Sequence, residues 1–173
     1  MNQLKIIHAA TTKHLGDVKK LMRAFVTWHR QRHTEDIALI NAYFDDDNFE
    51  KELQSLPGKY IANEGGCLLL AFYNELPTGC VALKKIDDKV CEMKRMFVYE
   101  SFHGKGIGHV LARAIVNEAM LMNYATIMLD TSFRQTEAIS LYKKMGFKES
   151  APYYILPKEL EDWLVFMRFD IQK

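Results

Sequence analysis

Residues 98–110, VYESFHGKGIGHV, join the end of one apolar segment to the start of another through three alternating glycines. Beyond the glycines, apolar residues recur at intervals of three and four, which predicts a helix packed on a sheet. Glycines at such a position let backbone N–H groups approach a ligand, and the start of a helix carries about half a positive charge. The stretch therefore predicts a site for a phosphate or pyrophosphate group, with Lys105 beside it as a mobile cation.

Three interpretations of the glycine stretch compete. A Walker loop needs Ser or Thr directly after its Gly-Lys pair, whereas Gly106 follows Lys105. A Rossmann fingerprint needs a third glycine where His109 stands, although Asp130, at the end of the next predicted strand, resembles the ribose-binding acid of that motif. The antiparallel pattern upstream is wrong for a βαβ dinucleotide domain. A glycine-rich turn without a ligand stays open as the third interpretation.

The sequence predicts an α+β fold in a single domain spanning residues 1–173. Period-two alternation or short apolar runs between turn residues predict strands, and helical spacing of apolar residues predicts helices. Strands are expected at residues 4–9, 67–72, 80–86, 90–98, 126–129 and 164–171, and helices after Thr11, over 36–43, after Asp45, from 107 and over 138–145. The three strands between residues 67 and 98 have short turns and make an antiparallel meander. Helices are expected to flank the sheet.

The composition is that of an ordinary globular protein. Apolar residues make up 49% and charged residues 26% of the 173 residues, and the formal net charge is +1. That balance supplies no global attraction to nucleic acid or to a membrane surface. No apolar run approaches the ~20 residues of a membrane span, and no secretory signal is evident. Three cysteines in apolar runs without metal-ligand spacing predict structural thiols, no bound metal and a cytoplasmic location.

Three blocks of sequence together resemble one enzyme family. His103-x-x-Gly106-x-Gly108 resembles motif A of the GNAT superfamily of N-acetyltransferases, whose pattern is Arg/Gln-x-x-Gly-x-Gly/Ala. EMKRMFV (92–98) resembles the fourth strand of that superfamily, and AISLYKKMGF (138–147) resembles its motif B. The likeness covers roughly residues 56–169, and its upstream part is similar to a bacterial branch without an assigned substrate. Position 103 departs from the pattern, because histidine replaces arginine or glutamine and its charge depends on pH.

The resemblance implies a mixed sheet in which the antiparallel meander is followed by a parallel strand at the cofactor cleft. It also implies acetyl-CoA as co-substrate, without a metal. The pantetheine arm would lie against the backbone of Met96, Phe97 and Val98, and Tyr142 would lie near the thioester sulfur. The residues expected to hold the pyrophosphate are His103, Gly104, Lys105, Gly106, Ile107, Gly108 and His109.

The expected chemistry is direct attack of a primary amine on the thioester in a ternary complex. An ammonium with a pKa near 10.4 must lose a proton first, at a cost of about 4–5 kcal/mol at pH 7. Glu92 is the candidate base, directly or through a water, and a salt bridge to Lys94 or Arg95 is its alternative role. Tyr142 resembles the family's general acid for the departing thiolate, and a core aromatic is its alternative role. A CoA-binding sensor without transferase activity is the alternative function.

The expected acceptor is a small-molecule amine that also carries an anionic group. Trp28, Arg30 and Arg32 lie in the segment that follows the first predicted helix, and in the resembled fold this segment forms a wall of the acceptor site. Lys94 adds positive charge from the catalytic strand, and arginine pairs bidentately with carboxylate or phosphate. A solvated helix end is the alternative interpretation. A homodimer is the default assembly.

Overall fold

One seven-stranded sheet forms the centre of the computed structural model, which describes residues 3–171. The order of the strands is β1-β2-β3-β4-β5-β7-β6. The strands are β1 Leu4–His8, β2 Cys67–Tyr73, β3 Leu76–Lys85, β4 Val90–Val98, β5 Thr126–Ser132, β6 Lys148–Glu149 and β7 Leu164–Asp170. The helices are α1 Thr12–Arg32, α2 Ile37–Tyr43, α3 Asp46–Ser55, α4 Ile107–Leu121, α5 Thr136–Met145 and α6 Lys158–Trp163.

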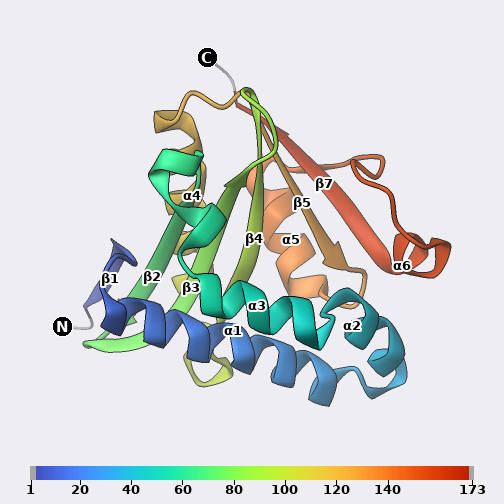
Figure 1. Cartoon of the computed structure of the whole chain (residues 1–173), viewed down its shortest axis with the longest axis horizontal. Helices are drawn as coiled ribbons and strands as arrows, with labels where there is room; N and C mark the ends of the chain where they lie inside the picture. The colour runs from blue at the N-terminus through green and yellow to red at the C-terminus, as the bar shows by residue number, and fades with distance from the viewer. Residues whose placement is uncertain (1–2, 172–173) are drawn as a thin grey trace.

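Each face of the sheet is covered by its own set of helices. In β2, Leu68 and Leu70 pack into one apolar cluster with residues of α1 and α3, whereas Leu69 and Ala71 pack into a second cluster with residues of α4. Successive side chains of a strand point to opposite faces, so this division follows from the alternation alone. Figure 1 shows α1 and α3 crossing one face of the sheet and α5 lying behind it.

The predicted α+β architecture is confirmed, including the meander β2–β3–β4 and the parallel pair β4–β5. Some predicted bounds were wrong, and two short elements were missed. The first helix continues beyond Trp28 to Arg32. Basic residues in its last turn stabilise this extension, because positive charge interacts favourably with the negative end of the helix dipole. The short elements β6 and α6 were not predicted, because two and six residues are too few to show a period.

The parallel strands β4 and β5 pair over only three positions. The last pair is Glu92 with Met128, and beyond it the two strands diverge toward the side of the molecule where α1 lies (Figure 1). The residues after this point are therefore not paired between these two strands. The facing edges of β4 and β5 therefore carry backbone groups that are free to hydrogen-bond a ligand in the middle of the sheet.

A bulge in β4 follows directly after the divergence begins. Cys80 of β3 pairs with Phe97, but Ala82 pairs with Lys94, so one residue of β3 faces two of β4. Arg95 occupies the bulge with φ of 56°, a left-handed conformation that is uncommon for arginine. Its guanidinium makes two hydrogen bonds to Glu52 of α3, both of 2.9 Å. The ion pair ties the bulge to the helix layer.

The Arg95–Glu52 pair should make stability depend on pH. Burial alone would raise the pKa of Glu52, but the hydrogen bonds and charge of Arg95, with smaller effects from Tyr60 and Lys59, lower it from 4.5 to about 2. A depressed folded-state pKa contributes stability that is present above about pH 4.5 and is lost as the pH falls toward about 2. We expect Glu52→Gln to lower the free energy of unfolding at pH 7 by about 3 kcal/mol, and the difference from the unmutated protein to shrink below about pH 4.5.

Chemical denaturation as a function of pH measures this effect. Glu50→Gln is the matched control, since Glu50 pairs with Arg23 at the exposed surface, where an ion pair contributes little. A difference between Glu52→Gln and the unmutated protein that stays constant down to about pH 3 contradicts the prediction.

Candidate active site

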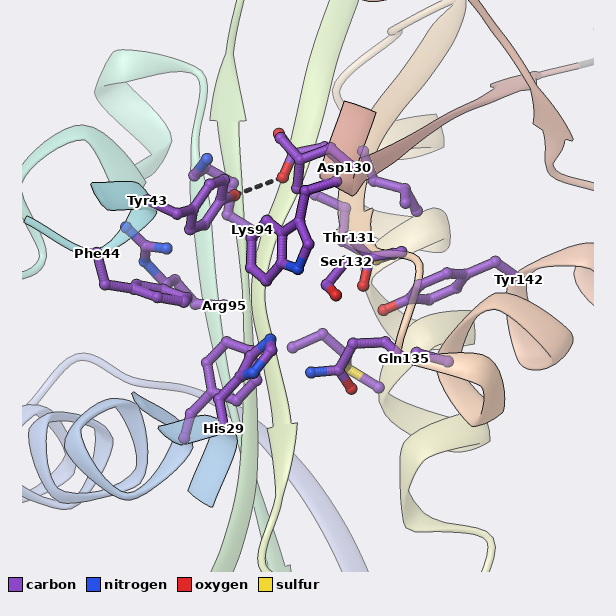
Figure 2. A pocket seen from close by; sticks show the side chains of 17 residues that line it. His29, Tyr43, Phe44, Lys94, Arg95, Asp130, Thr131, Ser132, Gln135 and Tyr142 are labelled. Atoms are coloured by element: carbon purple, nitrogen blue, oxygen red, sulfur yellow. Dashed lines mark hydrogen bonds between the residues drawn. The ribbon is translucent and has the colours of Figure 1, made fainter. Parts of the chain in front are cut away.

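A cavity lies between the diverging strands β4 and β5, and we call it the central cavity. Its walls are residues 93–96 of β4 and 129–132 of β5, with side chains from α1, α2 and α5 closing it (Figure 2). Lys94 and Arg95 both line this cavity, although alternation in a regular strand would send them to opposite faces. The bulge at Arg95 removes that alternation.

A second cavity of about 440 Å³ adjoins the first along the glycine stretch, and we call it the glycine-loop cavity. Most of the predicted cofactor residues line it, namely Met96, Phe97, Val98, His103, Gly104, Gly106, Ile107, Gly108 and Tyr142. Lys105 and His109 lie elsewhere. The ammonium of Lys105 stands over the ring of Tyr73, and His109 lines a separate surface depression with Arg113. The structure thus brings together nine of the eleven residues predicted for the cofactor.

The glycine loop has the backbone that an anion site needs. Gly104 and Gly106 have φ of 76° and 75°, a conformation that favours glycine, and a Cβ added at either would meet nothing within 4 Å. Gly106 is the N-cap of α4, and no side chain caps that helix. The first-turn N–H groups of α4 therefore have no side-chain cap, which is the arrangement that a phosphate site requires.

The two cavities share five lining residues, which are Phe25, Met96, Gln135, Ala138 and Tyr142. Burial raises the pKa of Tyr142, so its hydroxyl stays protonated and can donate. In Figure 2 this hydroxyl points from α5 toward β5. The side-chain nitrogen of Gln135 has no hydrogen-bond partner among the described residues, although it is buried. An unpaired buried donor at this junction suits a ligand carbonyl.

Sequence reasoning missed Gln135. Its one local signal is its place as a polar residue immediately before the helix that carries Tyr142.

Glu92 occupies the last paired position before the strands diverge, and only 2% of it is exposed. Its carboxylate binds the ammonium groups of Lys84 and Lys94 at 2.8 and 3.2 Å. Burial opposes ionisation of Glu92, but Lys94 and Lys84, together with the hydroxyl of Tyr153, outweigh it and hold the pKa below its ordinary value. The salt bridge to Lys94 that the sequence offered as an alternative is present. Glu92 does not itself line the central cavity.

Asp130 is the carboxylate that does line the central cavity. It accepts hydrogen bonds from Tyr43, from Tyr154 at 2.7 Å and from Tyr153 at 3.4 Å, and the bond from Tyr43 spans the cavity in Figure 2. The hydroxyl of Tyr153 also lies 2.8 Å from Glu92. Tyr153 therefore joins the two carboxylates into one network. Tyr43 lies 87 residues from Asp130 in the sequence, and Tyr153 and Tyr154 lie outside any predicted element, so no local pattern could have marked them.

A model of the acetyltransferase (GNAT) family matches residues 22–147 of this chain. The chain belongs to the GNAT family. It is an N-acetyltransferase, and the predicted resemblance is confirmed.

Individual relatives agree with this assignment. The chain is 28% identical to an uncharacterized N-acetyltransferase of Dictyostelium discoideum, over 89% of this chain and 93% of that protein. It is 34% identical to the N-acetylaspartate synthetase of Rattus norvegicus, over 57% of this chain and 34% of that protein. A solved GNAT acetyltransferase from Elizabethkingia anophelis with acetyl-CoA bound is 26% identical and superposes with a TM-score of 0.54, over 68% of this chain and 83% of that chain.

His103, the position that departs from the GNAT motif, is engaged within the protein. Its Nε2 lies 2.9 Å from the carbonyl oxygen of Val98, and because a carbonyl only accepts, Nε2 carries the proton. The imidazole also packs against Trp28 at 6.4 Å between ring centroids. His103 thereby ties the glycine loop of this GNAT protein to the end of β4.

The predicted acceptor wall is not assembled as expected. Trp28 and Arg32 line the glycine-loop cavity, where Arg32 pairs with Glu137 of α5. Arg30 instead donates to Asn41 and Asp46. The physical reason is that these residues lie within α1, where helical geometry sends Arg30 and Arg32 in different directions. Of the predicted substrate residues, Lys94 alone lines the central cavity.

His29 of α1 forms part of the central-cavity wall (Figure 2). Burial lowers its pKa to about 4, so the imidazole is neutral near pH 7. Its Nδ1 has no hydrogen-bond partner among residues 3–171. His29 thus adds a neutral polar group to a cavity whose charged lining residues are Asp130, Lys94 and Arg95.

Within residues 3–171, one group of side chains, His8, Cys67 and Glu118, has the spacing of potential metal ligands. Their ligand atoms lie within 4.8 Å of one another, and His8 already bonds Glu118 at 3.0 Å. These residues line neither cavity. All three cysteines are free and buried, as predicted for structural thiols. No helix of the described chain has both the length and the apolarity needed to span a bilayer.

The glycine-loop assignment leads to a prediction on CoA binding. Gly106→Val adds a branched side chain at a φ of 75°, and its Cβ would enter the open space where the anion is expected. We expect CoA affinity to fall at least tenfold, about 1.4 kcal/mol, as measured by titration calorimetry. Gly16→Val in α1 is the control, because Gly16 lines neither cavity and a Cβ added there would meet nothing within 4 Å. A folded Gly106→Val protein with unchanged CoA affinity would show that the loop assignment is wrong.

Proposed function

We propose that the chain transfers an acetyl group from acetyl-CoA to a primary amine of a small molecule, by direct attack in a ternary complex. The observation that carries the proposal is the meeting of the two cavities at Tyr142 and Gln135. The glycine-loop cavity, with its uncapped helix start, suits the acetyl donor. The central cavity, with the carboxylate of Asp130, suits the amine acceptor. Bound acetyl-CoA supplies the acetyl group as an activated thioester.

The residues of the glycine-loop cavity fit the donor. The uncapped start of α4 and the backbone of Gly104, Gly106 and Gly108 would hold the pyrophosphate. The backbone of Met96, Phe97 and Val98, on the diverging part of β4, would bind the pantetheine arm. The unpaired amide of Gln135 would donate to a carbonyl at the junction.

The acceptor must lose a proton as the C–N bond forms and the C–S bond breaks. Asp130 lines the cavity where the amine would stand, and Tyr153 links Asp130 to Glu92. We assign this network to removal of the proton, with Glu92 at its buried end. The hydroxyl of Tyr142 would supply the proton that the departing sulfur takes up.

The relatives favour a small acceptor. The N-acetylaspartate synthetase of Rattus norvegicus is named for the acetylated form of a free amino acid, not of a protein side chain. We also assign the enzyme to the cytoplasm, because its three cysteines are free thiols, and we expect a homodimer.

Turnover tests the proposal directly. The purified protein is mixed with acetyl-CoA and a panel of primary amines, and released CoA thiol is followed together with the mass of the amine. We expect stoichiometric release of CoA and formation of the N-acetyl product. Tight binding of CoA without turnover of any amine would support the non-catalytic alternative instead.

Two variants test the assigned residues. Glu92→Gln should lower kcat by about 10²-fold while CoA affinity stays nearly unchanged, and part of the loss should be recovered at high pH, where the amine deprotonates unaided. Tyr142→Phe should lower kcat similarly, without recovery at high pH. Tyr124→Phe is the matched control, because the Tyr124 hydroxyl bonds the carbonyl of Gly65 away from both cavities. An unchanged kcat in either variant removes that residue from its role.

A further inference from the structure

A third cavity, of about 500 Å³, adjoins the central cavity, and we call it the lysine chamber. The two share Tyr43, Lys94 and Arg95 as lining residues. The chamber is also lined by Lys84, by Glu92, by Lys85, which pairs with Asp88, and by Tyr153 and Tyr154 from the segment before α6. None of its lining residues belongs to the glycine-loop cavity. It is therefore an approach to the reaction centre that bound donor would leave open.

Positive charge exceeds negative charge around the lysine chamber. Lys84 and Lys94 share the single carboxylate of Glu92. Arg95 shares Glu52 with Lys59, which lies 3.4 Å from that carboxylate. Burial lowers the pKa of Lys59, the charge of Glu52 opposes that shift, and the charges of Lys84, Arg95 and Lys94 lower the pKa further, so Lys59 lies close enough to these three cations to be repelled by them.

Four cations thus face two carboxylates, Glu92 and Glu52, which leaves an excess of two positive charges among these groups before Asp130 is counted. The tyrosines around Asp130 do not alter this balance. Burial raises the pKa values of Tyr43, Tyr153 and Tyr154, so all three are neutral donors. One ligand carboxylate would offset part of this excess and would leave Asp130 for the ligand amine.

Asp130 provides the complementary end for an ammonium or amine. It is the one acidic side chain among the described residues that line the central cavity. Three successive contacts, of 3.2, 2.8 and 3.4 Å, lead from Lys94 through Glu92 and Tyr153 to Asp130. A small zwitterion can therefore reach from the lysines to Asp130.

We propose that the lysine chamber binds the carboxylate of a free amino acid against Lys84 and Lys94, and that the amine of this acceptor faces Asp130 in the central cavity. This inference rests on the proposed acetyl transfer and names its substrate class. It keeps the anionic acceptor that the sequence predicts but moves its binding site from Arg30 and Arg32 to β3 and β4. A polyamine would place a second ammonium beside three cations and is disfavoured.

Matched substrates test the inference on the unmutated enzyme. L-Leucine and L-aspartate are compared with L-leucinamide, phosphoethanolamine and spermidine. We expect kcat/KM for leucine to exceed that for leucinamide at least tenfold, although the amide has the less basic and more readily deprotonated amine. A kcat/KM for leucinamide or spermidine that equals or exceeds that for leucine overturns the inference. A higher kcat/KM for phosphoethanolamine than for leucine would show that the chamber binds a phosphate and not a carboxylate.

Variants locate the carboxylate site. Lys84→Met and Lys94→Met should each raise KM for the amino acid at least tenfold and leave KM for leucinamide unchanged. Lys89→Met, in the turn between β3 and β4, is the control and should change neither. Thermal melting checks that each variant folds, and if one does not, the substrate comparison on the unmutated enzyme still decides. No change in KM for the amino acid in folded variants contradicts the assignment.

The failure of the proposed function can be told apart from the failure of this inference. If no amine is acetylated, calorimetry still measures the affinity of leucine and of leucinamide for the protein. Binding of leucine that is weakened by Lys84→Met supports the amino acid site without catalysis. Equal binding of the two ligands, or binding of neither, rejects the site even if another amine is acetylated.

Discussion

The parallel pairing of β4 and β5 ends at Glu92 and Met128, and both cavities of the proposed reaction centre depend on that point. Buried backbone N–H and C=O groups are normally hydrogen-bonded. Where β4 and β5 diverge, such groups are no longer paired between the two strands and can bind a ligand. The bulge at Arg95 adds to the effect by turning β4 and by placing Lys94 and Arg95 on one cavity. A continuous sheet would be more regular and would have no room for a ligand.

Burial of charge is the cost of this arrangement, and the structure offsets it by pairing. Glu92, Glu52 and Asp36 are all buried or nearly so, and each carboxylate has a cationic partner within 2.9 Å. Breaking such a pair leaves an uncompensated charge, which typically costs 3–5 kcal/mol. The pairs also hold α3 against β4 and the α1–α2 connection against the loop that follows β5. Ionic contacts here position the proposed site more than they add net stability.

Much of the fold could be predicted, because its determinants are local. The alternation of β2, the helical spacing after Gly106 and the left-handed Gly146 after α5 each depend on neighbours in the chain. The glycine loop was predicted for the same reason, since its positive φ values require glycine at two positions. The short elements β6 and α6 were missed, because tertiary contacts and not periodicity stabilise them.

The sequence by itself determined the GNAT family, the order of most elements and the location of the glycine loop, because motif spacing and hydrophobic periodicity are properties of contiguous residues. Only the tertiary structure decided which charged groups meet. It separated Arg30 from Arg32, placed Arg32 beside the glycine loop, and joined Glu92 to Asp130 through Tyr153, which is 61 residues away from Glu92 in the chain. Side chains that come from distant segments meet only after strand pairing and helix packing have set their directions, and no local pattern encodes that outcome.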